Sequence, residues 1–233
     1  MSTITDFHSH ILPGMDDGSA SEEMSIAMLR MAAEQGITHV VATPHFYAHR
    51  ESLKEFLRRR EASEKRLREA LANHTDIPKI SIGAEVSFFS GISDADILSE
   101  LTIEGTRSIL IEMPRPPWTD SQYRELANIQ AKRGITPIIA HVDRYIHPFK
   151  THQIPERLQT LPVLVQANAG FFLHKATAKM ALRLLREDKI HLLGSDCHNV
   201  TSRAPNLGPA LQRIETRLGR AALDRICAQV QQL

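Results

Sequence analysis

The 233-residue sequence lacks the features that mark several common classes of protein. Its two cysteines, Cys197 and Cys227, are too few for the disulfide framework of a small secreted domain. No hydrophobic run is long enough to span a bilayer, and the polar first residues leave no room for a signal peptide, so we expect a cytoplasmic protein. The charges nearly cancel, with 28 basic and 27 acidic residues. This balance argues against a dominant role in binding nucleic acid or membrane surfaces.

Linkers rich in glycine and serine are absent too, and so are low-complexity stretches. Hydrophobic residues make up 42% of the chain, which is enough to bury a large core. We therefore expect residues 1–233 to form a single domain.

Short apolar runs rich in Ile and Val alternate with longer segments of helical period. This alternation predicts βα units and a parallel sheet. Seven such units predict an α/β fold, a closed or nearly closed (β/α)7 barrel with outer helices, one unit short of the common eight. The predicted strands are 4–7, 39–42, 80–84, 108–111, 137–140, 163–167 and 190–194.

Start and stop signals place three helices between these runs. Ser19-x-x-Glu22 has the spacing of a capping box, and Gly36 is a stop signal for the helix that follows it. Thr119 or Asp120 is the predicted cap of a second helix, which ends at Gly134. The charged segment 50–71 has Glu and Arg or Lys four residues apart, as expected of a helix with a solvated face.

Twelve histidines are the unusual feature of the composition, and their placement matters more than their number. Each predicted strand has a polar or metal-competent residue at its carboxyl end. In a barrel of parallel strands this edge carries the active site, because the βα loops converge there. In chain order these residues are His8 and His10, then His45, Glu85, Glu112, His141 and Asn168, and last Asp196 and His198.

The spacing within the motifs suits metal binding. Residues i and i+2 of a strand point to the same face, so His8 and His10 can both reach one ion while Phe7 and Ser9 face away. Asp196 and His198 have the same spacing, and the carboxylates of Glu85 and Glu112 can bridge two cations. Imidazole and carboxylate ligands without thiolate favour Mn, Fe or Zn over Mg or Ca.

Several motifs also have simpler interpretations. His39 and His191 do not follow a strand beside another ligand type, so we interpret them as ordinary histidines. Asp16-Asp17-Gly18 could be only a turn. Cys197 and Arg203 have the Cys-x5-Arg spacing of cysteine-based phosphatases, but the loop between them has no glycine and Asp196 precedes the cysteine. We interpret the cysteine as a coincidence, while Arg203 is a candidate for binding phosphate.

Together these motifs closely resemble the bacterial PHP-type protein-tyrosine phosphatases, the manganese-dependent enzymes of capsule and exopolysaccharide operons. The match runs nearly end to end and in the family's order. The long first motif separates this branch from other PHP proteins, such as histidinol-phosphate phosphatases. The motifs are Asp6-x-His8-x-His10-Ile11-Leu12-Pro13-Gly14-x-Asp16-Asp17-Gly18, Thr43-Pro44-His45, Gly83-x-Glu85, His141-x-x-Arg144-Tyr145 and Ser195-Asp196-x-His198-Asn199.

The resemblance implies a distorted barrel of seven βα units, the PHP fold, holding three metal ions, with Mn²⁺ preferred and Fe or Zn possible. Arg144 and Arg203 match the family's phosphate-binding arginines. Asp143 stands where the family usually has glutamate, so any help it gives to the arginine or the leaving group comes from a shorter side chain. The implied ligands are His8, His10, Glu85 and Asp196 for one metal, Glu85, Glu112 and His141 for a second, and Asp17, His45 and His198 for the third.

The resemblance further implies hydrolysis of phosphotyrosine by a metal-activated hydroxide. The implied substrate is the tyrosine-rich tail of a bacterial autokinase that controls polysaccharide export. Three alternatives remain open from the residues: another PHP phosphomonoesterase, an amidohydrolase-like metal hydrolase, and a non-catalytic metal-binding module. The amidohydrolase also opens with a His-x-His pair, but paired arginines of this kind are not typical of it.

Overall fold

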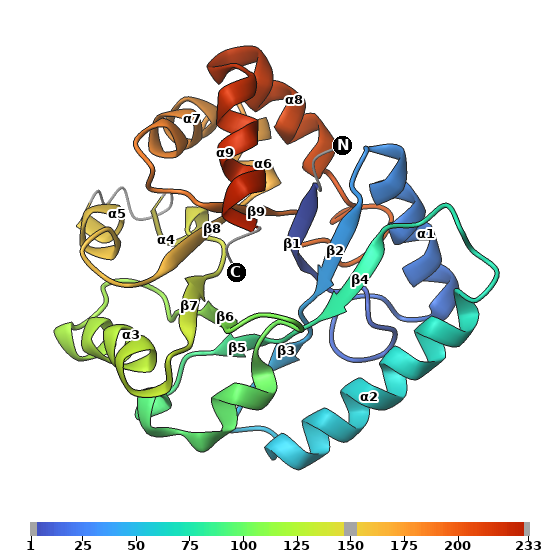
Figure 1. Cartoon of the computed structure of the whole chain (residues 1–233), viewed down its shortest axis with the longest axis horizontal. Coiled ribbons are helices and arrows are strands. Elements are labelled where there is room, and N and C mark those ends of the chain that lie inside the picture. The colour runs from blue at the N-terminus through green and yellow to red at the C-terminus, as the bar shows by residue number, and fades with distance from the viewer. Residues whose placement is uncertain (1–3, 147–152, 231–233) are drawn as a thin grey trace.

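Parallel strands form the centre of the protein, and helices surround them (Figure 1). The computed structural model describes residues 4–146 and 153–230. The strands are β1 (Thr5–Ser9), β2 (His39–Ala42), β3 (His45–Phe46), β4 (Lys79–Ile82), β5 (Glu85–Ser87), β6 (Ser108–Glu112), β7 (Thr136–Ile139), β8 (Leu164–Asn168) and β9 (Leu192–Gly194).

Helices follow most of the strands and cover the outside of the sheet. The α-helices are α1 (Glu22–Glu34), α2 (Leu53–Ala70), α3 (Asp120–Arg133), α4 (Asp143–Ile146), α5 (Gln153–Leu158), α6 (Ala169–Leu173), α7 (Ala178–Arg186), α8 (Leu207–Leu218) and α9 (Arg220–Val230). Two 3₁₀ helices, Ile92–Asp94 and Asp96–Leu101, precede β6. None of the helices in the described ranges is long and apolar enough to cross a membrane.

The nine strands occupy seven positions around the sheet. The hydrogen-bonded order is β1-β2-β4 in one sheet and β3-β5-β6-β7-β8-β9 in the other. Thr43 and Pro44 separate β2 from β3, and Gly83 and Ala84 separate β4 from β5. The Glu85 amide donates to the Pro44 carbonyl at 3.0 Å across these breaks. We therefore treat β2 and β3 as one bent strand, and β4 and β5 as another. All pairs are parallel, which confirms the predicted seven βα units.

The last strand meets the first and nearly closes the barrel. The Asp196 amide donates to the His8 carbonyl at 2.8 Å, and the His10 amide donates to the Cys197 carbonyl at 2.9 Å. These bonds lie just beyond β9, where Ser9 and Cys197 form a single parallel bridge. The prediction of a distorted, nearly closed barrel is confirmed.

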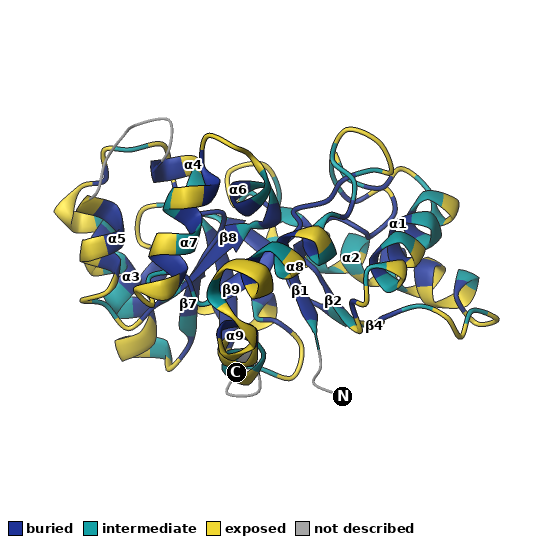
Figure 2. Ribbon diagram, turned by 90° about the horizontal axis from the view of Figure 1, so that it is seen from above, coloured by how far each residue is buried: buried dark blue, intermediate teal, exposed yellow. Residues whose placement is uncertain are grey.

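One layer of apolar side chains packs on each face of the sheet. The strands between the two layers are buried, whereas the helices expose their outer faces (Figure 2). One layer fills the space enclosed by the strands and includes Phe7, Val41, Leu110, Ile138 and Leu192. The other, larger layer joins the strands to the helices.

The predicted orientation of Phe7 was wrong, because β1 contains a bulge. The register of β1 on β2 shifts between Asp6 and Ser9, which inserts an extra residue into β1. Phe7 therefore packs inside the barrel, and His8, the next residue, also reaches the interior, where Nδ1 lies 3.3 Å from Gln166 Oε1. The period-2 argument does not hold through a bulge.

The helix boundaries follow local signals, with one correction. Thr119 is the cap of α3, one of the two residues predicted, and forms a capping box with Gln122; the helix ends at the predicted Gly134, in the left-handed region with φ 61°. The predicted cap Ser19 is wrong: α1 begins after Ser21, whose hydroxyl accepts from the Met24 amide. Ser19 instead donates to the Ser21 carbonyl at 2.9 Å, so it supports the true cap.

The predicted helix over 50–71 is α2, and its arginines do more than face solvent. Of the pairs expected, Glu64 and Arg68 form an ion pair at 2.6 Å. Arg59 instead contacts Glu51 and donates to the Met15 carbonyl, while Arg66 donates to the Pro13 carbonyl. These bonds hold the loop after β1 against α2.

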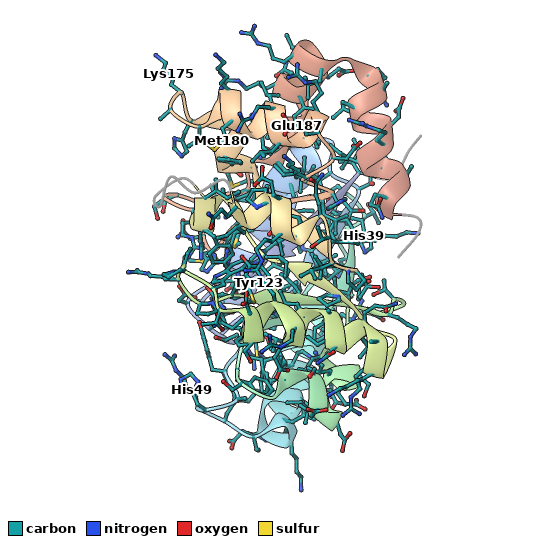
Figure 3. All side chains as sticks on the ribbon, turned by 90° about the vertical axis from the view of Figure 1, so that its left-hand side faces the viewer. His39, His49, Tyr123, Lys175, Met180 and Glu187 are labelled. Carbon is teal, nitrogen blue, oxygen red and sulfur yellow. The ribbon has the colours of Figure 1, made fainter. Side chains whose placement is uncertain are left out.

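The two ends of the strands lie on opposite sides of the molecule. His39 opens β2 and His49 follows β3, and Figure 3 shows the two side chains on opposite sides. The predicted site residues all belong to the side on which the strands end.

Candidate metal centre

The structure brings all nine predicted metal ligands together at the carboxyl ends of the strands. Every one of them lies within 4.0 Å of another member of the set through an imidazole–carboxylate contact. They fall into three groups, two of which share the carboxylate of Glu85, while His45 of the third contacts it. Their assignment as ligands stays a prediction, which the geometry below supports.

The first group consists of His8, His10, Glu85 and Asp196. The Nε2 atoms of the two histidines lie 3.1 Å apart, and each lies near Glu85 Oε2, at 3.1 Å for His8 and 3.4 Å for His10. Asp196 Oδ1 is 3.6 Å from His8 Nε2 and 3.5 Å from His10 Nε2. Ligand atoms about 2.1 Å from a tetrahedral ion lie about 3.4 Å from one another. His8, His10 and Glu85, whose ligand atoms all lie within 4.8 Å of one another, therefore have suitable separations for one metal, and Asp196 lies beside both histidines.

The second group uses the other oxygen of Glu85. Glu85 Oε1 lies 2.8 Å from His141 Nε2, which in turn lies 3.6 Å from Glu112 Oε1. Glu85 thus presents Oε2 to the imidazoles of His8, His10 and His45, and Oε1 to the imidazole of His141. This is the placement expected of a bridging carboxylate.

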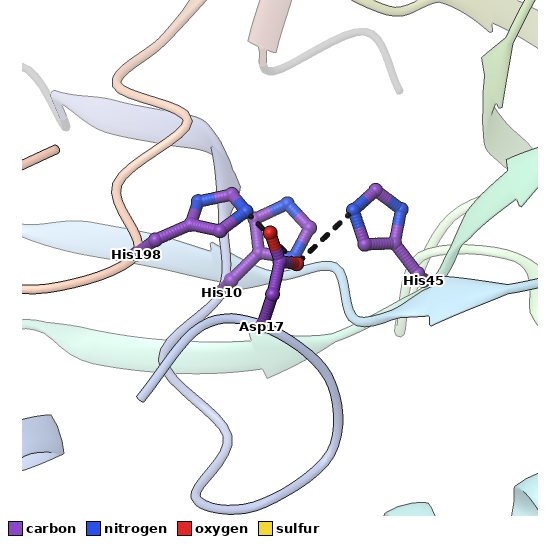
Figure 4. Close-up of side chains that lie close together, drawn as sticks. All are labelled: His10, Asp17, His45 and His198. Atoms are coloured by element: carbon purple, nitrogen blue, oxygen red, sulfur yellow. Dashed lines mark ion pairs between the residues drawn. The ribbon is translucent and has the colours of Figure 1, made fainter. Parts of the chain in front are cut away.

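The third group lies around Asp17 (Figure 4). Asp17 Oδ1 is 3.6 Å from His45 Nε2 and 3.4 Å from His198 Nε2. His10 belongs to this group as well as to the first, and the Nδ1 atom of His45 lies 3.0 Å from Glu85 Oε2. The three groups are therefore contiguous, and the division between them is less sharp than the family resemblance implies.

The electrostatics of the site keep its carboxylates ionised. Burial opposes ionisation, but the imidazoles of His8, His10 and His141 hold the pKa of Glu85 well below its usual range. Burial also opposes the charge on His141, but Glu112 and Glu85 raise its pKa to about 9. Burial and the neighbouring His10 lower the pKa of His198 to about 4, so its ring is neutral at pH 7 and can bind a metal.

The buried polar atoms of the site fit divalent cations. Glu85 Oε2 and His198 Nε2 are buried and have no hydrogen-bond partner of suitable geometry, although both point at other ligand atoms. Burying a carboxylate among imidazoles without satisfying it is costly. A metal ion would satisfy both kinds of donor at once, and the mixed nitrogen and oxygen set suits Mn, Fe or Zn.

Backbone strain marks the same place. Three described residues other than glycine have positive φ, and two of them are the predicted ligands His141, at 31°, and Asp196, at 54°. Such conformations cost about 1–3 kcal/mol and tend to persist where function requires them. The strain is therefore a second, independent sign of a site at this edge.

Supporting residues were missed by the sequence analysis. Asp16, interpreted as part of a turn, accepts from His10 Nδ1 at 2.7 Å and from the His45 amide at 2.9 Å. Gln166 contacts His8 Nδ1 and accepts from the His141 amide at 2.6 Å. Such partners fix the ring orientation of ligating histidines. A polar residue inside the apolar run 163–167 was the available signal for Gln166.

Two arginines flank the centre. Arg203 Nη2 donates to Asp196 Oδ1 at 2.8 Å, and Arg144 Nη2 donates to Asp196 Oδ2. Both line a cavity of about 360 Å³ beside the metal-ligand groups, together with Asp143 and Asn168. Asp143 Oδ1 accepts from the Asn168 amide at 2.9 Å, a contact that fixes the start of α4. The arginines thus face an open space next to the candidate metal positions.

The cysteine does not fit the nucleophile of a cysteine-based phosphatase. Cys197 is 2% exposed, and burial, with Asp6 nearby, raises the pKa of its thiol. Its backbone joins the first strand to the last. A buried, protonated thiol has a structural role here.

The chain is similar to known proteins over nearly its whole length. The tyrosine-protein phosphatase YwqE of Bacillus subtilis is 31% identical over 226 residues, covering 92% of this chain and 85% of that protein. The tyrosine-protein phosphatase CpsB of Streptococcus pneumoniae is 30% identical over 229 residues, covering 92% and 90%.

A solved structure described as one of the unique metal-dependent tyrosine phosphatases YwqE and CpsB matches with a TM-score of 0.81 at 26% identity, covering 94% of this chain and 89% of that one. The family model for capsular polysaccharide synthesis, CpsB/CapC, matches residues 4–232. The chain therefore belongs to the CpsB/CapC family, as its motifs had indicated.

Proposed function

We propose that this chain is a metal-dependent protein-tyrosine phosphatase, with three metal ions in the groups described above. The single observation that carries the proposal is Glu85, whose Oε2 faces several imidazoles and whose Oε1 faces His141, beside two arginines. Divalent cations held there would lower the pKa of a bound water toward neutrality and would offset the charge of the phosphoryl group.

The protein's own residues would bind and orient the phosphate. Among the described residues, the guanidinium groups of Arg144 and Arg203 each donate one hydrogen bond to Asp196, so further N–H groups remain to donate to phosphoryl oxygens. Asp196 would hold both arginines beside the metals that it also ligates. Asp143 is proposed as a positioning residue, because its carboxylate fixes the backbone next to Arg144.

The chemistry suits an aryl phosphate. A tyrosine leaving group has a pKa of about 10, so it needs less help from a general acid than a serine alkoxide would. We propose Mn²⁺ as the native metal, with Fe or Zn as alternatives. We further propose the phosphorylated tail of a bacterial tyrosine autokinase as substrate, which would place the protein in the cytoplasm.

Chelation and substitution together test the proposal. We expect turnover of a phosphotyrosine peptide to be lost with chelator and in His8→Ala, and retained in Cys197→Ser. A Cys197→Ser variant without activity, or a wild-type protein active in chelator, would overturn it. A panel of phosphotyrosine, phosphoserine and histidinol phosphate, with amides and lactones, separates the alternative hydrolases.

A further inference from the structure

A basic groove on the outside of the barrel has no role in the chemistry above. It lies between α7 and α8 and has a volume of about 580 Å³. Its walls carry Lys179, Arg183 and Arg186 from α7 and Arg217 from α8, and its floor is apolar, with Met180 and Leu218. No acidic residue is among those that line it in the described ranges. Figure 3 shows Met180 and Lys175 at this edge of the molecule.

The positive charges of the groove are only partly neutralised by the protein, through Glu187, which interacts with Arg183 and Arg186. Within the described part of the chain, Arg183 has one acidic neighbour, Glu187 at 3.9 Å, whereas Lys179, Arg186 and Arg217 have none within 4.0 Å. Lys179 and Arg183 are four residues apart on one helix, and like charges at this spacing destabilise a helix. The net charge of the whole chain is only +1, so the excess is local. An anionic partner would relieve this repulsion.

The groove adjoins the cavity that holds Arg144 and Arg203. His174 and Thr177 line that cavity, while Ala176 and Lys179 line the groove, so one short segment separates the two. The Thr177 hydroxyl donates to the Phe171 carbonyl at 2.8 Å, which anchors this segment. A helix is about 10 Å wide, and an extended peptide advances about 3.3–3.6 Å per residue. About three to five residues of an extended peptide would therefore reach from the cavity to the groove.

We propose that the groove between α7 and α8 binds an acidic segment of the protein substrate, a few residues from its phosphotyrosine. The carboxylates would pair with the unpaired cations, and an apolar side chain of the same segment would lie on Met180 and Leu218. The inference rests on the proposed function for the phosphotyrosine and adds a preference for its sequence context.

Matched peptides and variants test this proposal. One phosphotyrosine peptide has Ala and Gly flanks, and two others carry four Glu residues three to six positions before or after the phosphotyrosine. In the triple variant Arg183→Gln, Arg186→Gln, Arg217→Gln we expect KM for an acidic peptide to rise about tenfold, as the loss of three surface ion pairs implies. We expect kcat, and KM for the neutral peptide, to stay unchanged.

A control removes the same charge elsewhere. The variant Lys65→Gln, Lys79→Gln, Arg124→Gln alters three exposed cations on α2, β4 and α3 and should leave KM for all peptides unchanged. Equal KM changes for neutral and acidic peptides, or no change in the groove variant, would overturn the proposal. Loss of binding to phosphatidylglycerol vesicles in the groove variant, with unaltered peptide kinetics, would overturn it in favour of a membrane surface.

Binding without turnover keeps the two proposals separate. Fluorescence anisotropy with an unphosphorylated acidic peptide measures the groove alone, and the affinity should fall with added salt. Binding to wild-type protein that is lost in the groove variant would support the groove even if no phosphotyrosine were hydrolysed. Equal binding to both proteins would exclude it.

Discussion

The two ends of the barrel hold histidines in opposite chemical settings. At the carboxyl ends of the strands, buried carboxylates raise the pKa of His10 and His141 in spite of burial. At the amino ends, His39 contacts the Ser81 hydroxyl at 2.9 Å and His191 accepts from the Val165 amide at 3.0 Å, and burial lowers the pKa of both. The same residue type thus lies in a candidate metal site at one end and contacts only polar groups of the fold at the other, and its neighbours decide which.

The largest effect should come from the residue that joins the three groups. Glu85→Gln keeps the size of the side chain but removes the charge that two metals would share. We expect kcat/KM to fall by about 10³-fold or more, with loss of bound metal. Turnover of a phosphotyrosine peptide measures kcat/KM, and elemental analysis of the purified variant measures the bound metal.

The matched control for Glu85 lies at the other end of the barrel. His39→Gln can keep a hydrogen bond to Ser81 and should leave metal content and turnover as in the wild type. A Glu85→Gln protein that holds its metals and turns over normally would contradict the division between the two ends.

Substitution of the arginines should lower the rate of hydrolysis and leave the metal content unchanged. Arg203→Lys keeps a positive charge but loses the planar pair of donors that matches phosphate. We expect kcat/KM to fall by about 10²-fold with unchanged metal content. A parallel loss of metal would instead mean that Arg203 acts by holding Asp196.

A smaller effect should follow from the carboxylate that orients His10. In Asp16→Asn the partner of His10 Nδ1 loses its charge, so we expect metal affinity to fall about tenfold to a hundredfold. Titration of metal-free protein with Mn²⁺ measures this affinity. Ser81→Ala, which removes the partner of His39, is the matched change at the amino end and should not alter it.

Regular periodicity made much of the fold predictable from sequence. Each of the seven predicted strands overlaps one strand of the sheet, and the short strands β3 and β5, which continue β2 and β4, were not predicted. The candidate ligands could be predicted to lie together because parallel strands bring their carboxyl ends to one edge, which places His8, Glu85 and Asp196 on the same side of the sheet. The identity of each group came from the family's motifs.

Local departures from periodicity could not be predicted. The bulge in β1 turns Phe7 and His8 to the same interior, and nothing in the alternation of side chains signals an extra residue. The role of Asp16 depends on how the loop after β1 folds back on His10, a contact between side chains and not a spacing. Tertiary contacts decide both cases.

The smallest effect, a change in stability alone, should come from His191. His191→Ala leaves the Val165 amide without its acceptor, which should cost about 1 kcal/mol at pH 7.5 and leave turnover unchanged. Because burial lowers the pKa of His191 in the fold, its neutral form stabilises the protein fully above the unfolded value of about 6.5 and less as the pH falls below it. Urea denaturation at pH 7.5 and at pH 5.5 should therefore show a smaller difference between variant and wild type at the lower pH. A difference that grew toward acid would mean that His191 is charged in the fold and resembles His10 and His141.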